Sequence, residues 1–318
     1  MDRLWKINEF RGKVKKVDIK VLIIGFGSMG RKHYEALKKI TNNITVLTKQ
    51  KKINCSTIKS IKDIPKLDPE YIVISCETIK HYDFIKYIEK KLKNKIILIE
   101  KPIMEKFRVL KLKNNKYFIG YNLRFHPVIL FLKKIIKGKD VTFVNLNCSS
   151  FLPHWRKNID YSKSNSALKK KGGGLILELS HELDYINWLF GSITPLFKFS
   201  KKISNLKIDT DDILIIFGKI KKKININISM NFFSRYNNRE IIIDGKDFSI
   251  RANILKNQVD IFKNNRKKKM IRWSNFHIKQ TYLDEHLAIL KKKYSLLCKP
   301  NEALATLKFI DKIKEVTI

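Results

Sequence analysis

The spacing of Gly25, Gly27 and Gly30 predicts a phosphate-binding turn of the form G-x-G-x-x-G. An apolar run at residues 21–24 precedes the turn, and from Ser28 onward apolar residues recur three and four positions apart, as in a helix. A glycine turn between a buried strand and a helix is typical of dinucleotide sites, because free N–H groups at the helix N-terminus attract phosphate. The sequence therefore predicts a dinucleotide pyrophosphate site here, against the alternative of a glycine turn without a ligand.

Each glycine of this turn has a separate expected task. Gly25 permits the tight bend, Gly27 lets the backbone approach the pyrophosphate, and Gly30 allows the helix to pack closely on the strand. The residues between the glycines should contact the cofactor as well, and these are Phe26, Ser28 and Met29.

The residues after the second predicted strand, 44–47, bear on the choice between NAD and NADP. An NAD site usually has an acid there that binds the ribose 2′-hydroxyl. The residues of this chain at that place, which include no acid, are Thr48, Lys49, Gln50, Lys51 and Lys52. We therefore expect NADP, with Thr48 and a lysine such as Lys49 at the 2′-phosphate, while the abundance of lysine throughout the chain leaves NAD open.

The strand predicted at residues 70–76 ends in polar groups that could face the cofactor. Cys76 ends it, Glu77 follows, and His81 lies near the start of the next helix. We expect these three residues at the cofactor pocket, although His81 could instead pack inside the domain.

Glu100 and Lys101 follow the strand at residues 95–99 and precede Pro102. Open α/β sheets bind ligands at the carboxyl ends of their strands, and the proline keeps Lys101 extended at that edge. A protonated lysine there could hydrogen-bond a reacting oxygen and stabilise developing alkoxide charge. We therefore expect Lys101 to be catalytic and both residues to contact the cofactor; the alternative is one more surface lysine.

A second group of candidate residues follows the glycines at 172–174. The sequence up to Gly191 predicts a helix with apolar residues on one side and Glu178, His181 and Asp184 among the polar residues on the other. Histidine suits proton transfer because its unperturbed pKa of about 6.5 lies near working pH. We predict that these three residues are the candidates for proton transfer, with His181 as the first of them. The alternative is that they form a solvent-exposed face of the helix.

The polar segment 152–174, which precedes this helix, is interpreted as a substrate loop or as a solvated connection. Its side chains that could stack on a sugar ring or hold an anion are His154, Trp155, Arg156 and Tyr161. Arg124, in the earlier segment GYNLRFHP, is also expected to contact the substrate.

These residues belong to an expected α/β protein of two domains. Residues 1–121 would form a Rossmann domain with a doubly wound parallel sheet, and its first residues, 1–17, would be a loosely packed N-terminal extension. Residues 122–318 would form an α/β domain, because short alternating segments from Ile193 onward predict a large, mostly antiparallel sheet in the form of a meander. The outward face of that sheet could pair copies of the chain, so we expect a homo-oligomer.

Composition limits the classes of function. The chain has 318 residues and a formal net charge of +38, from 67 Lys and Arg against 29 Asp and Glu. The lysines are spread from end to end rather than gathered in one stripe with aromatic residues, which argues against specific nucleic-acid binding. The four cysteines are far apart, so neither a zinc site nor a disulfide framework is predicted, and we expect no metal. Without an apolar leader or a run long enough to span a membrane, the chain is expected to be cytoplasmic, with no membrane partner.

The order of these motifs resembles the glucose-fructose oxidoreductase and inositol dehydrogenase (Gfo/Idh/MocA) family. The matching features are the glycine turn, the tripeptide from Glu100 to Pro102, the GYNLRFHP segment and the glycine-led helix with His181. The resemblance implies a Rossmann domain, a second α/β domain with an oligomer-forming sheet, and oxidation or reduction of sugars, inositols or sugar nucleotides with NAD or NADP. Relatives with an H-E-L-D helix resemble enzymes of surface-glycan sugar synthesis.

One position departs from the pattern of that family. Its members usually have an aspartate four residues before the catalytic histidine, but Leu177 occupies that place here and the acid is Glu178. Alignment from the glycines would instead put Glu182 in the place of the histidine. Two hypotheses follow: an active oxidoreductase that transfers a hydride to or from a hydroxyl or keto carbon, and a cofactor-binding relative without turnover.

Overall fold

The computed structural model describes residues 15–51, 53–156 and 158–314. Most of the predicted N-terminal extension, residues 1–14, lies outside them, as does Lys52. The described chain joins the fold at Val17, whose backbone N–H donates to the carbonyl of Ile40 at 2.8 Å.

The described residues divide into two compact units. The first unit consists of the residues up to Phe125 together with His277–Leu307, and the second consists of His126–Phe276 together with the residues from Lys308 onward. The segment 277–307, which the sequence places in the second domain, therefore packs with the first unit.

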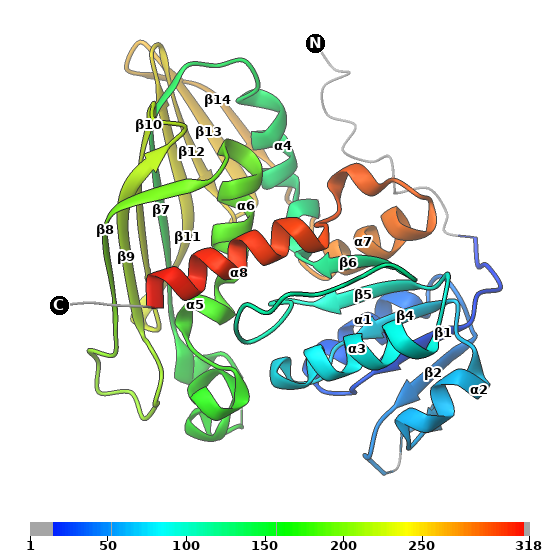
Figure 1. The fold of residues 1–318 in the computed structure, drawn as a ribbon. Coiled ribbons are helices and arrows are strands. Elements are labelled where there is room, and N and C mark those ends of the chain that lie inside the picture. The colour runs from blue at the N-terminus through cyan, green and yellow to red at the C-terminus, as the bar shows by residue number, and fades with distance from the viewer. Residues whose placement is uncertain (1–14, 52, 157, 315–318) are drawn as a thin grey trace. The chain divides into compact units, whose positions relative to one another are not determined.

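The first unit is built on a six-stranded sheet in which all strands are parallel (Figure 1). Its strands are β1 (Val21–Ile24), β2 (Ile44–Leu47), β3 (Ser56–Ile58), β4 (Tyr71–Ile74), β5 (Ile96–Glu100) and β6 (Lys116–Gly120). Their spatial order, β3-β2-β1-β4-β5-β6, is that of a doubly wound Rossmann sheet and confirms this part of the predicted fold class. The strand order reverses between β1 and β4, so the carboxyl ends of these two strands form the place where such sheets bind ligands.

Helices connect or cover these strands. They are α1 (Ser28–Leu37), α2 (Ile64–Leu67), α3 (His81–Lys91), α7 (Gln280–Leu290) and α8 (Pro300–Lys314), whose last turns belong to the second unit. Helix α7 packs on α1, where Leu283 and Leu287 share one buried core with Ala36 and Leu37. This shared apolar core explains why the segment 277–307 belongs to the first unit.

The second unit is built on an eight-stranded sheet with the order β14-β13-β12-β11-β7-β10-β9-β8. Its strands are β7 (Val141–Phe151), β8 (Ile193–Lys201), β9 (Ile213–Ile220), β10 (Ile224–Asn231), β11 (Phe233–Gly245), β12 (Phe248–Asn253), β13 (Gln258–Lys263) and β14 (Arg266–Arg272). Only β7 and β10 pair in parallel, so the predicted, mostly antiparallel sheet is confirmed. The predicted meander is wrong in one respect, because β7 lies between β10 and β11. Strand β14 was not predicted, since its basic residues hide the alternation of a strand.

Three helices, α4 (Pro127–Ile135), α5 (Leu175–Glu178) and α6 (Ser180–Phe190), lie on one face of this sheet (Figure 1). The sequence predicted one helix between Gly174 and Gly191, but the structure divides it into α5 and α6. The break is at Leu179, whose φ and ψ are −94° and 24°. The carboxylate of Asp211 accepts a hydrogen bond from Ile176 N at 2.9 Å, which ties α5 to the chain before β9 rather than to α6.

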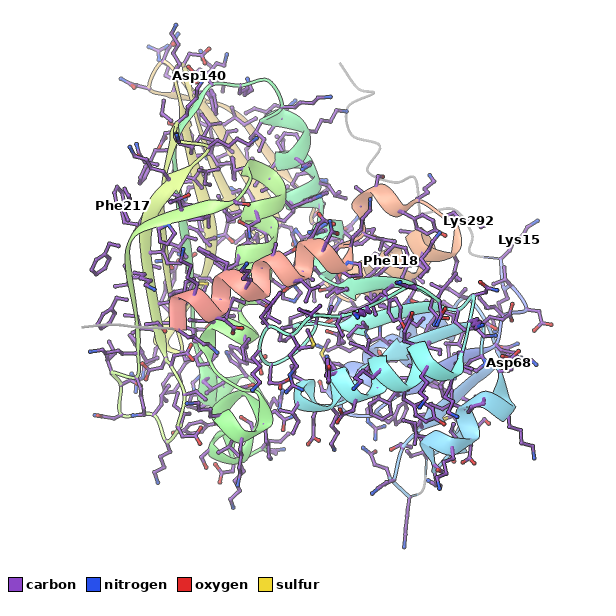
Figure 2. All side chains as sticks on the ribbon, in the orientation of Figure 1. Lys15, Asp68, Phe118, Asp140, Phe217 and Lys292 are labelled. Atoms are coloured by element: carbon purple, nitrogen blue, oxygen red, sulfur yellow. The ribbon has the colours of Figure 1, made fainter. Side chains whose placement is uncertain are left out.

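The opposite face of the sheet carries exposed aromatic side chains. Phe197 on β8 and Phe217 on β9 are cross-strand partners and are 55% and 41% exposed. Figure 2 shows Phe217 on the side of the sheet away from α6. Pairing of chains through this face stays a prediction.

The start of α4 depends on a buried histidine. His126 is 1% exposed, its Nδ1 accepts a hydrogen bond from Val128 N at 3.3 Å, and its Nε2 lies 3.1 Å from Asn257 Oδ1. Because Nδ1 accepts, the neutral ring carries its proton on Nε2 and donates it to Asn257. Burial lowers the pKa of His126 to about 3, which outweighs the opposing effect of the bond to Asn257.

Acid should therefore destabilise the protein through His126. The unfolded chain takes up this proton near pH 6.5 and the folded chain only near pH 3, so the free energy of unfolding falls by up to about 1.4 kcal/mol per pH unit in that window. In urea titrations, His126→Asn, which keeps a capping side chain, should lose about 2 kcal/mol less than the wild type between pH 7 and pH 5. The exposed His154→Asn control should behave as the wild type; equal losses in all three proteins would contradict the assignment.

Candidate functional site

The glycine turn after β1 leaves room for a ligand at one position and for nothing at the two others. A Cβ atom added at Gly27 would have no neighbour within 4 Å. One added at Gly30 would lie 2.1 Å from the carbonyl oxygen of Gly25, and one at Gly25, whose φ is +92°, would lie 2.7 Å from Cys76 Cα. The turn therefore lets α1 pack closely against the ends of β1 and β4 and leaves open space beside Gly27.

The N-terminus of α1 faces that open space with its backbone donors. Gly27 is the residue before the helix, Ser28 is exposed, and among the described residues no side chain caps the first turn and no acid lies in it. Uncapped N–H groups and the positive end of the helix dipole make such a terminus an anion site. The pyrophosphate of a dinucleotide fits this position; Phe26 lies buried beneath it and Met29 is half-buried.

Cations and an amide surround the carboxyl end of β2. Gln50 Nε2 donates to the carbonyl of Phe26 at 3.1 Å, while its Oε1 accepts from Arg31 at 3.0 Å. The guanidinium of Arg31 also lies 4.6 Å from the centroid of the Phe26 ring. Lys59 Nζ donates to the carbonyl of Gln50 at 2.9 Å, and the side chain of Lys49 is exposed nearby in sequence. The sequence identified this segment but missed Arg31 and Gln50 as the residues that link it to the glycine turn.

Thr48 has an internal role at this strand end. It is 9% exposed, and its Oγ1 accepts a hydrogen bond from Gln50 N at 3.2 Å. Thr48 thus orders the turn that carries Gln50.

Two buried side chains lie against the backbone on both sides of Lys101. Glu100 Oε2 accepts from Lys101 N at 3.0 Å. The ring nitrogens of His81, which is 1% exposed, lie 3.1 Å from the carbonyl of Pro102 and 3.2 Å from that of Cys76. A neutral ring has one N–H and can donate to only one of these two carbonyls. His81 packs inside the unit, which is the alternative considered for it, and its place in the cofactor pocket stays a prediction.

The charges behind Lys101 follow from burial. Burial alone would raise the pKa of Glu100, but the hydrogen bond and charge of His33, with the charge and backbone N–H of Lys101, lower it below the usual value. Burial lowers the pKa of His81 despite its carbonyl partners, so its ring is neutral at pH 7. Burial also raises the pKa of the Cys76 thiol to about 12, so this thiol, which follows β4, is uncharged at pH 7. Glu77 pairs with Lys80 at 2.5 Å on the surface.

The polar residues after Gly174 have separate surroundings. Glu178, on α5, accepts a hydrogen bond from Ser166 Oγ at 2.7 Å, whereas His181 and Asp184 lie on α6. His181 is half-buried and Asp184 is 2% exposed. Because the helix breaks at Leu179, the spacing of three residues between Glu178 and His181 no longer places them on one helix face.

Glu182 has a structural partner rather than an open position. Its side chain is fully buried, and Oε1 lies 2.7 Å from Arg239 Nε on β11. Tyr185 OH contacts the same oxygen at 3.5 Å. A buried carboxylate needs such a partner, since an unpaired buried charge is costly. The arrangement favours the half-buried His181 over Glu182 as the group of this helix that could handle a proton, and the sequence did not identify Arg239.

The predicted substrate residues of the second unit lie on an exposed loop. Trp155 Nε1 donates to Ser150 Oγ at 3.0 Å, and His154 lies edge-on to the Phe151 ring. Arg156 is exposed, whereas Tyr161 OH accepts from Lys207 N at 3.0 Å. These contacts anchor the loop to its own unit and leave its substrate role a prediction.

Arg124 lies within the first unit and is 2% exposed. Its guanidinium pairs with Glu302 at 3.2 Å, which ties the turn after β6 to α8. The prediction that Arg124 contacts the substrate therefore competes with this internal ion pair.

The described residues contain no group of three His, Cys, Asp or Glu side chains that could hold a metal ion. None of the helices among them is both long and apolar enough to cross a membrane.

The fold and the two groups of residues define an α/β protein with a Rossmann unit and a second unit built on a large, mostly antiparallel sheet. Residues 133–316 match the family described as "Oxidoreductase family, C-terminal alpha/beta domain" of the Gfo/Idh/MocA group. The chain therefore belongs to the Gfo/Idh/MocA oxidoreductase family, which confirms the resemblance seen in its motifs.

Solved structures with the same fold cover nearly the whole chain. A levoglucosan dehydrogenase in complex with NADH has a TM-score of 0.79 at 16% identity, covering 93% of this chain and 96% of its own. An oxidoreductase from Thermotoga maritima has a TM-score of 0.75 at 18% identity, covering 95% and 96%. A UDP-N-acetylglucosamine 3-dehydrogenase from Acidithiobacillus ferrooxidans has a TM-score of 0.71 at 15% identity, covering 94% and 96%. No curated protein sequence matches the chain significantly.

The open space at Gly27 gives a test that separates ligand binding from folding. Gly27→Ala should fold with an unchanged melting temperature, because its Cβ meets no neighbour and φ there is −75°. The methyl group would occupy the pyrophosphate position, so the Kd for NADPH in a fluorescence titration should rise at least about tenfold. The matched Gly30→Ala should instead lower the free energy of unfolding by about 1–3 kcal/mol through the contact with Gly25 O. Unchanged NADPH binding by Gly27→Ala would refute the pyrophosphate assignment.

Proposed function

We propose that this chain is an NAD(P)-dependent oxidoreductase that transfers a hydride between its cofactor and a hydroxyl or keto carbon of a sugar, an inositol or a sugar nucleotide. The observation that carries the proposal is the turn at Gly27, where open space adjoins the uncapped N-terminus of α1 at the switch point of a Rossmann sheet. Family membership supports the reaction class. Two structures of similar fold, a levoglucosan dehydrogenase and a UDP-N-acetylglucosamine 3-dehydrogenase, support a sugar-type substrate.

The residues of the first unit would hold the cofactor along one path. The turn from Gly25 to Gly30 would bind the pyrophosphate, and Arg31, Lys49 and Gln50 would surround the 2′-phosphate of NADP. Bound there, the nicotinamide supplies the hydride chemistry, and the protein has to orient the substrate and handle one proton.

Lys101 is proposed to act as a hydrogen-bond donor to the reacting oxygen. An ammonium group at this position can donate to the reacting oxygen and stabilise alkoxide charge. Its backbone N–H donates to Glu100, and the buried His81 ring lies against the carbonyl of the next residue, Pro102, which restricts the position of the Lys101 Cα atom.

His181 is proposed to accept or donate the proton of the hydroxyl group. It is half-buried, and the next acid along the chain, Glu182, is occupied by Arg239. Asp184 and Glu178 are the second and third candidates for this role. Leu177, in place of the usual aspartate, favours the second hypothesis, a relative that binds the cofactor without turnover.

Replacing Lys101 tests the catalytic role directly. With NADPH and a panel of keto-sugars and sugar nucleotides that includes oxidised UDP-N-acetylglucosamine, Lys101→Met should lower kcat by at least about 100-fold, because a donor to the developing charge is lost. NADPH binding should change little, and Lys106→Met, at an exposed lysine of the same segment, should keep full activity. Tight NADPH binding without turnover by the wild type on every substrate would support the relative without turnover instead.

The choice of cofactor is tested at Arg31. If its guanidinium contacts the 2′-phosphate, Arg31→Ala should weaken NADP binding by about 10- to 100-fold, the value of a charged hydrogen bond, and leave NAD binding within about twofold. Calorimetry with both cofactors measures this difference, and Lys39→Ala, an exposed cation near the other end of α1, is the control. An equal loss of affinity for both cofactors would show that Arg31 does not contact the 2′-phosphate of NADP.

A further inference from the structure

A chain of buried hydrogen bonds leads from β4 to Glu100. Tyr71 OH lies 2.7 Å from His286 Nδ1, His286 Nε2 lies 3.0 Å from His33 Nδ1, and His33 Nε2 lies 2.8 Å from Glu100 Oε1. The exposed fraction is zero for the first three residues and 5% for Glu100. All four residues belong to the first unit, and they come from β4, α7, α1 and β5.

The carboxylate sets the direction of every donor in the chain. Glu100 receives a backbone N–H on Oε2, so as an anion it accepts the Nε2–H of His33 on Oε1. With a single proton on its ring, placed on Nε2 by that bond, His33 accepts on Nδ1, which requires His286 to carry its proton on Nε2. His286 in turn accepts on Nδ1, and only the hydroxyl of Tyr71 can donate there. Every proton in the chain points toward Glu100.

Adding one proton to this chain would leave a buried group without a partner. Whether Glu100 or His33 gains it, His286 has to move its own proton to Nδ1 and donate to the oxygen of Tyr71. The hydroxyl hydrogen of Tyr71 then needs a second acceptor, and among the described residues the hydroxyl has no hydrogen bond besides the one to His286; Glu285 acts on it through charge alone. An orphaned buried donor is costly, so the chain resists protonation.

The charged neighbours of the chain do not all act in one direction: the charge of Lys101 opposes an added proton, whereas that of Glu285 favours one. Lys101 favours the carboxylate of Glu100, and Tyr282, edge-on to His33, stays protonated because burial and then the charges of Glu100 and Glu285 raise its pKa. Burial, then the charge of His33, lowers the pKa of His286. Burial, then the charge of Glu285, raises the pKa of Tyr71. The neutral His81 is the remaining titratable group near Glu100.

We propose that Tyr71, His286 and His33 are positioning residues, whose one-way donors keep Glu100 a carboxylate in acid and thereby hold the backbone of Lys101 in its working position. The proposal rests on the proposed function of Lys101 for its effect on rate. The chain itself can be observed without any turnover.

The kinetic test removes the last donor with a matched control. In Tyr71→Phe, His286 Nδ1 has no partner whether or not it carries the proton, so the resistance to protonation is lost. The pH at which kcat falls off in acid should rise by about one unit, so that kcat below this pH is about tenfold lower than in the wild type. The rate at alkaline pH should stay within about twofold of the wild type. Tyr117→Phe removes a hydroxyl that donates to Glu89 at 2.7 Å in the same sheet, away from Glu100, and should not change the pH at which kcat falls off. Equal shifts in the two variants would overturn the proposal.

The spectroscopic test does not depend on activity. In ¹⁵N-labelled wild type, correlations between ring nitrogens and carbon-bound protons should show at pH 7 that the His286 ring is neutral and carries its proton on Nε2, because burial lowers its pKa. In Tyr71→Phe, His286 should begin to change tautomer or protonate at least about one pH unit higher than in the wild type. A wild-type His286 with its proton on Nδ1 at pH 7 would overturn the proposal. Correct tautomers in a protein without turnover would instead count against the proposed function alone.

Discussion

The contact between the backbones of Gly30 and Gly25 is the constraint on which the first unit depends. No side chain fits between α1 and the end of β1, because a Cβ at Gly30 would lie 2.1 Å from the carbonyl oxygen of Gly25. This close approach aims the N-terminus of α1 at the ends of β1 and β4, where anions bind. One turn further along the same helix, it also presses His33 against Glu100. The proposed phosphate site and the contact of His33 with Glu100 therefore both depend on one helix position.

The second unit stabilises a buried carboxylate, that of Glu182, in another way. There the break at Leu179 separates α5 from α6, so Glu178 bonds the loop at Ser166 while the later residues lie over the sheet. Glu182 then falls inside the unit, where Arg239 of β11 neutralises it. Because Glu182 is paired in this way, the half-buried His181 is the preferred candidate on α6 for the proposed proton transfer.

The sequence was sufficient for features that repeat locally and insufficient for those that depend on distant partners. Buried parallel strands and the glycine spacing have strong local patterns, so the Rossmann order and the turn could be predicted. His33 lies on the buried stripe of α1, three residues after Gly30 and four before Leu37, and that position could have marked it as internal. Its partner His286 is 253 residues away, and no local pattern links the two. Arg239 was missed for the same reason, since only the folded sheet brings it to Glu182.

In a chain with 67 basic and 29 acidic residues, the position of the acids is more informative than that of the lysines. A lysine on the surface costs little, so its presence at a strand end predicts little. An acid buried in the interior needs donors on its oxygens. Glu100 has them from His33 and Lys101 N, and Asp212 has them from Ile203 N and Ser204 N. Glu100 and Asp212 thus each bind backbone N–H groups, and Glu100, beside Lys101, holds the backbone on which the proposed chemistry depends.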